Sequence, residues 1–193
     1  MKRHERTVVE AWFGDAYARL HPRLQRLHRH DGVLRGPVGV RVARGGIARW
    51  IGERLRRSLG LPPPGPGHEM EVHIRHEPDQ MHWERSFDGA GAFASRFVPS
   101  GHFPDGEWRE YGGPVELFLG VELDDDGGWH WHTRRVRWRG LRMPRVLFPR
   151  VVAHKRWDHG AYDFAVSVRV PGLGEVVGYR GRLLPIDADA MKQ

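Results

Sequence analysis

The sequence predicts an α+β protein in which N-terminal helices pack on a large, curved antiparallel β-sheet. Apolar side chains alternate with other residues over long stretches of residues 107–184. A period of two places one face of a strand in the core and the other in water, as in antiparallel sheets. Short turns favour a meander, and a sheet of many strands tends to curl or to close as a lipocalin-like barrel. The clearest alternating runs are Val115, Leu117, Leu119, Val121 and Leu123, and Tyr162, Phe164, Val166, Val168 and Val170.

The composition is that of a folded domain without disulfides. The chain has 193 residues, of which 39% are hydrophobic and 28% are charged, and it contains no cysteine. This length is sufficient to bury a core, and without cysteine there is neither a disulfide nor a thiol nucleophile. The charged start, residues 1–6, leads into no apolar run, so we expect no signal peptide and a cytoplasmic location.

The net charge of +7 raises the question of a polyanionic partner. Lysine is rare, because Lys2, Lys155 and Lys192 are the only lysines among the 31 basic residues. A GC-rich coding sequence gives such an arginine excess without any selection for a partner, and the chain has no long basic run. We therefore interpret the arginines as solvated surface residues and expect no specific nucleic-acid partner.

Residues 7–29 are predicted to be helical, with a break just before Pro22, which cannot occupy an unbroken helix interior. Thr7 and Glu10 have the spacing of a capping box, in which each side chain satisfies an amide of the first turn. A strand over residues 38–42 is a further candidate in the glycine- and valine-rich stretch that follows. The apolar residues that form one helical stripe are Val9, Phe13, Ala16, Leu20, Leu24 and Leu27.

Residues 47–59 are predicted to form a short, basic amphipathic helix. Four apolar residues at steps of four lie beside Trp50 and among several arginines. The prolines and glycines of residues 62–67 must end this helix. We therefore divide the chain into an N-terminal helical segment, 1–67, and an antiparallel sheet or barrel, 68–185, within one structural domain. The four apolar residues are Ile47, Ile51, Leu55 and Leu59.

Between seven and nine strands are predicted in the remainder of the chain. Residues 124–128 and 158–160 are predicted to form hairpin turns, because they contain aspartate and glycine, which accept a positive φ. The predicted strands are 69–77, 80–87, 92–98, 107–111, 114–124, 128–139, 150–157, 161–170 and 174–184.

Several short motifs follow one another in an order that is typical of a known bacterial family. They are Leu20-His21-Pro22, Trp83-x-Arg85-x-Phe87, Phe93 with Ser95, Glu110-x-Gly112, Leu117-x-Leu119, Phe164-x-Val166-x-Val168, Pro171 and Gly178-Tyr179-x-Gly181. On these residues the chain resembles the uncharacterised domain-of-unknown-function 4166 family (DUF4166). The resemblance extends over about residues 17–185, and its specificity lies in the order and spacing of the motifs.

The resemblance implies the boundaries of the fold more than a function, because the family has no established activity. Members of the family occur alone and as the C-terminal part of larger proteins, some with a Rossmann-type reductase-like domain in front. The resemblance therefore implies a reductase-like partner by association only. This chain has no strand–GxGxxG–helix unit that would bind a dinucleotide itself.

Trp83, Arg85 and Phe87 share one face of a predicted strand, and this face is the best candidate for a ligand site. An unpaired guanidinium in a core is costly. Either Arg85 is therefore paired with a carboxylate, for which Glu110 and Glu116 are candidates, or the face lines a cavity open to water. In the first case the arginine is structural. In the second, its planar fork suits the carboxylate or phosphate of an anionic ligand.

Other groupings of reactive residues indicate no particular chemistry. His130 and His132 share a strand face, but no third ligand with metal-site spacing accompanies them, so we expect no metal. No Gly-x-Ser-x-Gly motif, which would indicate a serine nucleophile, is present. We also expect no cofactor. Tyr179 lies between Gly178 and Gly181, which would allow a ligand to approach closely but more often mark a bulge in a barrel strand.

Our leading functional hypothesis is the binding of a small molecule that is apolar or lipid-like. This molecule would have an anionic end if Arg85 is available to bind it. The candidate ligand-binding residues are Trp83, Arg85, Phe87, Glu110 and Tyr179. The alternative is a non-hydrolytic enzyme, of the isomerase or cyclase type, in the same cavity. Its acid and base candidates are Tyr179, Glu110 and His154.

A third hypothesis is a peripheral membrane or protein-interaction module. Here the 47–59 helix would make the contact through Trp50, Ile51 and Leu55, with the surrounding arginines attracted to an anionic surface. The competing interpretation is that the same apolar stripe packs on the sheet. Exposure of the stripe distinguishes the two.

Overall fold

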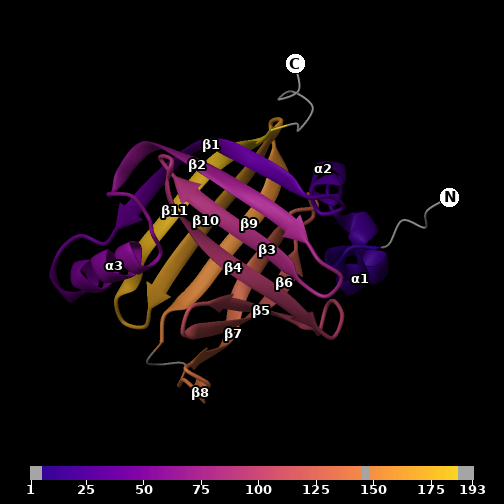
Figure 1. Ribbon diagram of the computed structural model, residues 1–193. Helices are drawn as coiled ribbons and strands as arrows, with labels where there is room; N and C mark the ends of the chain where they lie inside the picture. The colour runs from indigo at the N-terminus through magenta and orange to yellow at the C-terminus, as the bar shows by residue number, and fades with distance from the viewer. Residues whose placement is uncertain (1–5, 145–147, 187–193) are drawn as a thin grey trace.

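The computed structural model describes residues 6–144 and 148–186, which form a closed ten-stranded antiparallel barrel with helices at both ends (Figure 1). Strands adjacent in the sequence pair with each other, and the pairing of β1 with β11 closes the ring. β8 is a two-residue addition that pairs with β7, outside the ring. The strands are β1 (Gly32–Val42), β2 (Gly65–His76), β3 (Met81–Phe87), β4 (Ala90–Ser100), β5 (Glu107–Gly112), β6 (Val115–Leu123), β7 (Trp129–Trp138), β8 (Leu141–Arg142), β9 (Arg150–Asp158), β10 (Ala161–Val170) and β11 (Gly174–Ile186).

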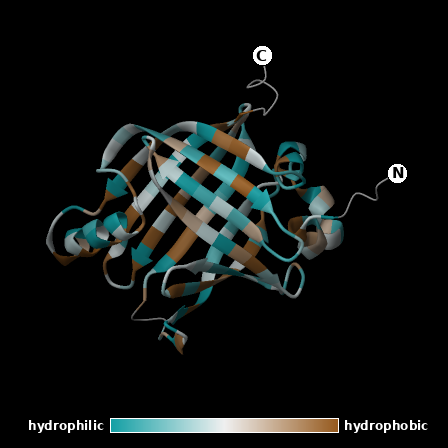
Figure 2. Cartoon of the chain, viewed as in Figure 1, coloured by the Kyte–Doolittle hydropathy of each residue, from teal (hydrophilic) through white to brown (hydrophobic). Residues whose placement is uncertain are grey.

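The period-two pattern predicts most of this architecture. All nine predicted strands are present and antiparallel, and the expected α+β class and the closed barrel are both confirmed. Apolar and polar residues alternate along the strands in Figure 2, as a barrel with a buried interior requires. The interior is rich in large aromatic side chains, among which Trp108, Trp129 and Tyr162 are almost completely buried.

β1 is longer than the strand predicted over residues 38–42. Its apolar period is interrupted by glycines that the pairing with β11 requires. A Cβ atom on Gly36 would lie 2.3 Å from a backbone oxygen of β11, and one on Gly181 would lie 2.4 Å from a backbone oxygen of β1. Glycine therefore lets these two strands approach closely. Because glycine has no side chain, the alternation of apolar and polar residues that would predict the full length of β1 is interrupted.

The segment before residue 67 thus supplies a barrel strand as well as helices. β2 also begins earlier than predicted, at Gly65, inside the stretch that we interpreted as a linker. Gly67, near the start of the strand, has a φ of 81°, a conformation that glycine adopts more readily than other residues.

The first three helical elements, α1 (Val8–Phe13), η1 (Gly14–Arg19) and α2 (Pro22–Leu27), close one end of the barrel (Figure 1). The predicted capping box is confirmed, and so is the break before Pro22. The aromatic side chains of α1 enter the barrel, where the Trp12 ring lies 5.5 Å from that of Trp108. These helices therefore act as an apolar plug.

The remaining helix, α3 (Gly46–Ser58), lies at the opposite end of the barrel (Figure 1). It packs closely on β11, because a Cβ atom on Gly52 would lie 2.2 Å from the backbone oxygen of Val176. Three residues of its stripe, Ile51, Leu55 and Leu59, pack against the core. In the described part of the chain, no helix is long and apolar enough to cross a membrane.

His28, at the end of α2, is fully buried against the aromatic interior. The centroid of its imidazole ring lies 5.0 Å from the ring centroid of Trp129 and 6.3 Å from that of Trp83. Neither ring nitrogen has a hydrogen-bond partner among the described residues. Burial, and next the nearby Lys155 and His76, lower the pKa of His28 well below its ordinary value.

We expect His28→Phe to make the free energy of unfolding less dependent on pH in weak acid. The unfolded chain binds a proton at His28 as the pH falls through about 6.5, whereas the folded protein does not. Acid therefore destabilises the folded state by up to about 1.4 kcal/mol per pH unit at this residue. Urea unfolding at about pH 5 and about pH 7.5 measures the difference. Equal losses of stability in wild type and variant would contradict this account.

Candidate functional site

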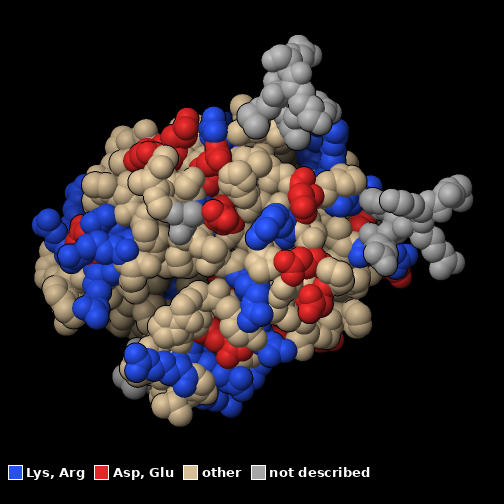
Figure 3. Space-filling view, in the orientation of Figure 1, with Lys and Arg blue, Asp and Glu red and all other residues tan. Residues whose placement is uncertain are grey.

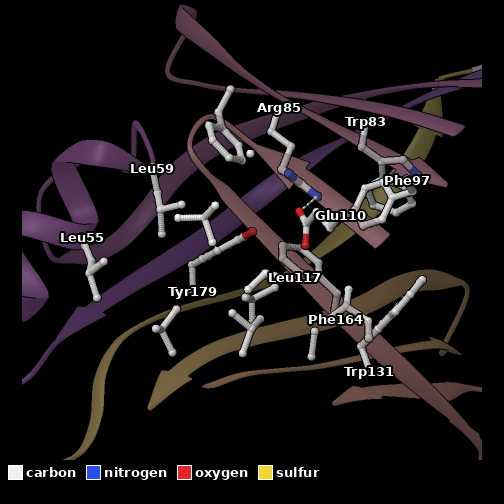
Figure 4. Close-up of a pocket in the computed structure, with 18 of the residues that line it drawn as sticks. Leu55, Leu59, Trp83, Arg85, Phe97, Glu110, Leu117, Trp131, Phe164 and Tyr179 are labelled. Carbon is white, nitrogen blue, oxygen red and sulfur yellow. Dashed lines mark ion pairs between the residues drawn. The ribbon is translucent and has the colours of Figure 1, made fainter. Parts of the chain in front are cut away.

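The barrel encloses a cavity of about 410 Å³ between its aromatic interior and α3. This volume lies within the range of small-molecule sites, roughly 300–1,000 Å³. The wall is almost entirely apolar, and Figure 4 shows side chains from several strands converging on it. Leu55 of α3, Leu59 directly after this helix, the turn between β5 and β6, and Phe148 and Pro149 also line the cavity, and we refer to this end as its mouth.

Arg85 and Glu110 lie on this wall, and Ser95, which does not itself line the cavity, joins them in a hydrogen-bonded chain. The Arg85 Nη1 donates to Ser95 Oγ at 3.0 Å, and Ser95 Oγ donates to Glu110 Oε1 at 2.7 Å. The Arg85 Nη2 lies 3.9 Å from the same carboxylate oxygen, an ion pair marked by a dashed line in Figure 4. Only 11% of the Arg85 side chain and 16% of the Glu110 side chain are exposed. Arg85 is therefore paired with a carboxylate and also lines a cavity, so the two alternatives that we considered for it do not exclude each other. Glu116 pairs instead with Arg137, at 3.6 Å.

Lys155 is the functional candidate that the sequence analysis missed. It is 8% exposed and lines the cavity. Its Nζ lies 3.8 Å from the centre of the Trp83 ring, 5.0 Å from that of Trp131 and 5.4 Å from that of Trp129. Burial, followed by the Arg85 charge, lowers the pKa of Lys155 well below its ordinary value, against the opposite effect of Glu110. We refer to Arg85, Ser95, Glu110 and Lys155 as the inner cluster.

The signal for Lys155 was available in the sequence. Val151, Ala153 and Lys155 alternate along β9, so the same period that placed Arg85 on an inner face also places Lys155 there. In the sequence analysis, Lys155 was considered only for its contribution to the net charge and not for its position on the strand.

Two tyrosines complete the polar groups of the cavity. Tyr179 lines it, and its hydroxyl points toward the Arg85–Glu110 pair in Figure 4. Tyr162 also lines it, and its hydroxyl has no hydrogen-bond partner among the described residues. Burial raises the pKa of both phenols, so they are neutral hydroxyl groups near pH 7.

The other candidate residues are placed less centrally. Trp83 lines the cavity, whereas Phe87 lies behind Tyr179, with ring centroids 6.0 Å apart. His154 borders the cavity, but its imidazole lies 3.8 Å from Asp163 and beside His130, on the outer face of the barrel. Among the acid and base candidates, the cavity thus brings together Tyr179 and Glu110 without the imidazole of His154.

Of the residues proposed for a membrane or partner contact, Trp50 is 64% exposed, whereas Ile51 and Leu55 pack on the core. In the part of the chain that the structure describes, no group of three or more His, Asp or Glu side chains is arranged to hold a metal ion.

The chain belongs to the family described as "Domain of unknown function (DUF4166)", whose family model matches residues 20–183. The matched region contains the barrel from β1 into β11, and the resemblance seen in the sequence is confirmed. No curated protein and no solved structure matches the chain. The functional argument therefore depends on the geometry of the cavity.

We expect Arg85→Met to lower the free energy of unfolding by about 3 kcal/mol, because it leaves the Glu110 carboxylate buried without a cation. Arg85→Met combined with Glu110→Leu should recover most of this loss. Arg137→Met is the matched control, since its pair with Glu116 is more exposed and should contribute no more than about 1 kcal/mol. Urea unfolding of the four proteins measures these values. An Arg85→Met variant as stable as wild type would show that the ion pair contributes nothing to the fold.

Proposed function

We propose that the barrel binds a small, mostly apolar, lipid-like molecule whose polar end lies at the inner cluster. The single observation that supports this most directly is an apolar cavity of about 410 Å³ with charged groups grouped on part of its wall. Sites for small molecules combine an apolar lining with a few convergent polar groups in this way. The apolar body of the ligand would contact side chains such as Leu117, Phe164 and Val168.

The charges of the inner cluster favour an oxygen-bearing polar end. Glu110 compensates the charge of Arg85 through Ser95 and the 3.9 Å ion pair. Lys155 has no such partner, because no hydrogen bond or ion pair joins it to any described residue. An oxygen at the polar end of the ligand, from a carboxylate or a carbonyl group, would interact with the Lys155 nitrogen.

We expect native mass spectrometry of freshly purified protein to show a bound small molecule that denaturation releases. Leu117→Trp should lose this molecule and bind the fluorescent probe anilinonaphthalene sulfonate at least about tenfold more weakly, a difference of about 1.4 kcal/mol. The added indole occupies the cavity. Leu184→Trp is the matched control, because it adds the same side chain to an exposed position on β11. Equal probe binding by the two variants would argue against a ligand in the cavity.

The mouth of the cavity favours a second, compatible function, docking on an anionic membrane surface. Ile47 and Trp50 of α3 are 62% and 64% exposed, beside the helix face that lines the mouth. On another side of the mouth, Trp138 and Leu141 are exposed at the β7–β8 hairpin, which is anchored by the hydrogen bond from Arg139 N to Pro114 O. Figure 3 shows basic side chains gathered over α3 and around β8. The exposed arginines of the two elements are Arg49, Arg54, Arg57, Arg139 and Arg142.

We expect the protein to sediment with vesicles of phosphatidylcholine and phosphatidylserine, and not with phosphatidylcholine alone. Arginines near an anionic surface contribute about 1 kcal/mol each, and exposed apolar side chains insert beside them. Ile47→Asp with Trp50→Asp should weaken vesicle binding more than about tenfold, because burial of a large apolar side chain contributes about 1.5–3 kcal/mol. Leu184→Asp is the control, far from the mouth. Equal sedimentation of both variants with anionic vesicles would exclude docking through α3.

A further inference from the structure

We propose that Lys155 binds its ligand covalently, as an imine formed with the carbonyl carbon of an aldehyde or ketone held in the cavity. This inference rests on the proposed function in one respect, namely that the same cavity holds the ligand. It assigns the chemical class of the ligand and makes Lys155 the attachment site.

The position of Lys155 exposes its amine to the cavity and to little else. The side chain extends from the inner face of β9, and the faces of Trp83, Trp129 and Trp131 surround its nitrogen. Among the described residues the amine makes no hydrogen bond and no ion pair, although only 8% of the residue is exposed. A group in this position is free to react with a molecule that enters the cavity.

The surroundings are unfavourable for an ammonium ion. An ammonium group has three N–H donors that need acceptors, and a buried donor without a partner is costly. Arg85 repels a second positive charge, and Glu110 already interacts with Arg85. Burial and the Arg85 charge thus outweigh Glu110 and favour the neutral amine, which is the nucleophilic form of lysine.

The reaction balances without an oxidant or a reductant. The lone pair of the neutral amine attacks the carbonyl carbon, and a proton moves from nitrogen to the former carbonyl oxygen to give a carbinolamine. Loss of the hydroxyl group with a proton then releases one water molecule and leaves a C=N bond. Glu110 and the Tyr179 hydroxyl line the same cavity and are the groups suited to pass these protons.

The product fits the site better than an ammonium ion does. A protonated imine has the same charge but a single N–H donor, so the lack of acceptors costs less. The three indole faces and the Glu110 carboxylate attract either cation, so the difference between the two lies in the number of N–H donors left without acceptors. The apolar lining limits access of the water that would hydrolyse the C=N bond.

The rarity of lysine makes the test specific. Lys2 and Lys192, both outside the described residues, are the only other lysines. In a Lys2→Arg, Lys192→Arg variant, Lys155 and the N-terminal amine are therefore the only primary amines. We expect decanal with sodium cyanoborohydride to add one decyl group to Lys155 of this variant, as located by peptide mapping, and to label the N-terminal amine more slowly. Further substitution of Lys155→Arg or Lys155→Met should abolish that adduct and leave labelling of the N-terminus unchanged.

Two additional readouts separate this chemistry from nonspecific labelling. Leu117→Trp, which occupies the cavity, should slow labelling of Lys155 at least tenfold without affecting the N-terminus. The yield at Lys155 should remain high at a pH well below the range in which an exposed lysine reacts, because the amine is neutral there. Labelling of Lys155 no faster than that of the N-terminus, or unaffected by Leu117→Trp, would overturn the proposal.

Displacement of anilinonaphthalene sulfonate by decanal, decanol and decanoic acid distinguishes failure of this inference from failure of the proposed function. Displacement by all three without an adduct at Lys155 would leave ligand binding intact and exclude the imine. Displacement by decanoic acid alone, stronger at lower pH and lost in Lys155→Met, would show that Lys155 holds a carboxylate as an ammonium ion, which also overturns the proposal. No displacement by any of the three would contradict the proposed function itself.

Discussion

The pairing of β1 with β11 is the constraint on which the rest of the structure depends. Without it the other strands would form an open sheet with two unpaired edges, and the inner side chains would face water. Closure gives every barrel strand two neighbours and turns one face of the sheet into an enclosed interior. The close approach at Gly36 and Gly181 is what permits this pairing, so two positions without side chains determine whether an interior exists.

A ten-stranded ring encloses more space than its own side chains fill, and the two ends use that space differently. At the plug end, the aromatic rings of α1 pack against those of Trp108 and Trp129. At the α3 end, the helix rests on the rim of β11 through Gly52 and leaves the centre open. The cavity is thus a consequence of placing a plug at one end and a cover at the other.

The sequence allows the strands and the inner position of Arg85 to be predicted because both follow from a local period. It does not allow the extent of β1 to be predicted, because the close contacts that require glycine there involve a strand about 140 residues away. The choice of Glu110 over Glu116 as the partner of Arg85 depends on the neighbouring strands that supply Ser95, which no local pattern contains. Lys155 is the opposite case. The alternation along β9 is sufficient to predict that its side chain faces the interior, but we did not draw that conclusion from the sequence.

The polar groups of the interior differ in what they contribute to the fold. Arg85, Ser95 and Glu110 satisfy one another across three adjacent strands, β3, β4 and β5, and therefore join one wall of the barrel. Lys155 comes from the opposite part of the ring, on β9, and makes no hydrogen bond or ion pair with any residue that the structure describes. A residue that is buried, titratable and without a partner does not stabilise a folded chain. Under the proposed function, a molecule in the adjoining cavity would complete the interactions of Lys155, whereas the Arg85–Ser95–Glu110 chain is complete without one.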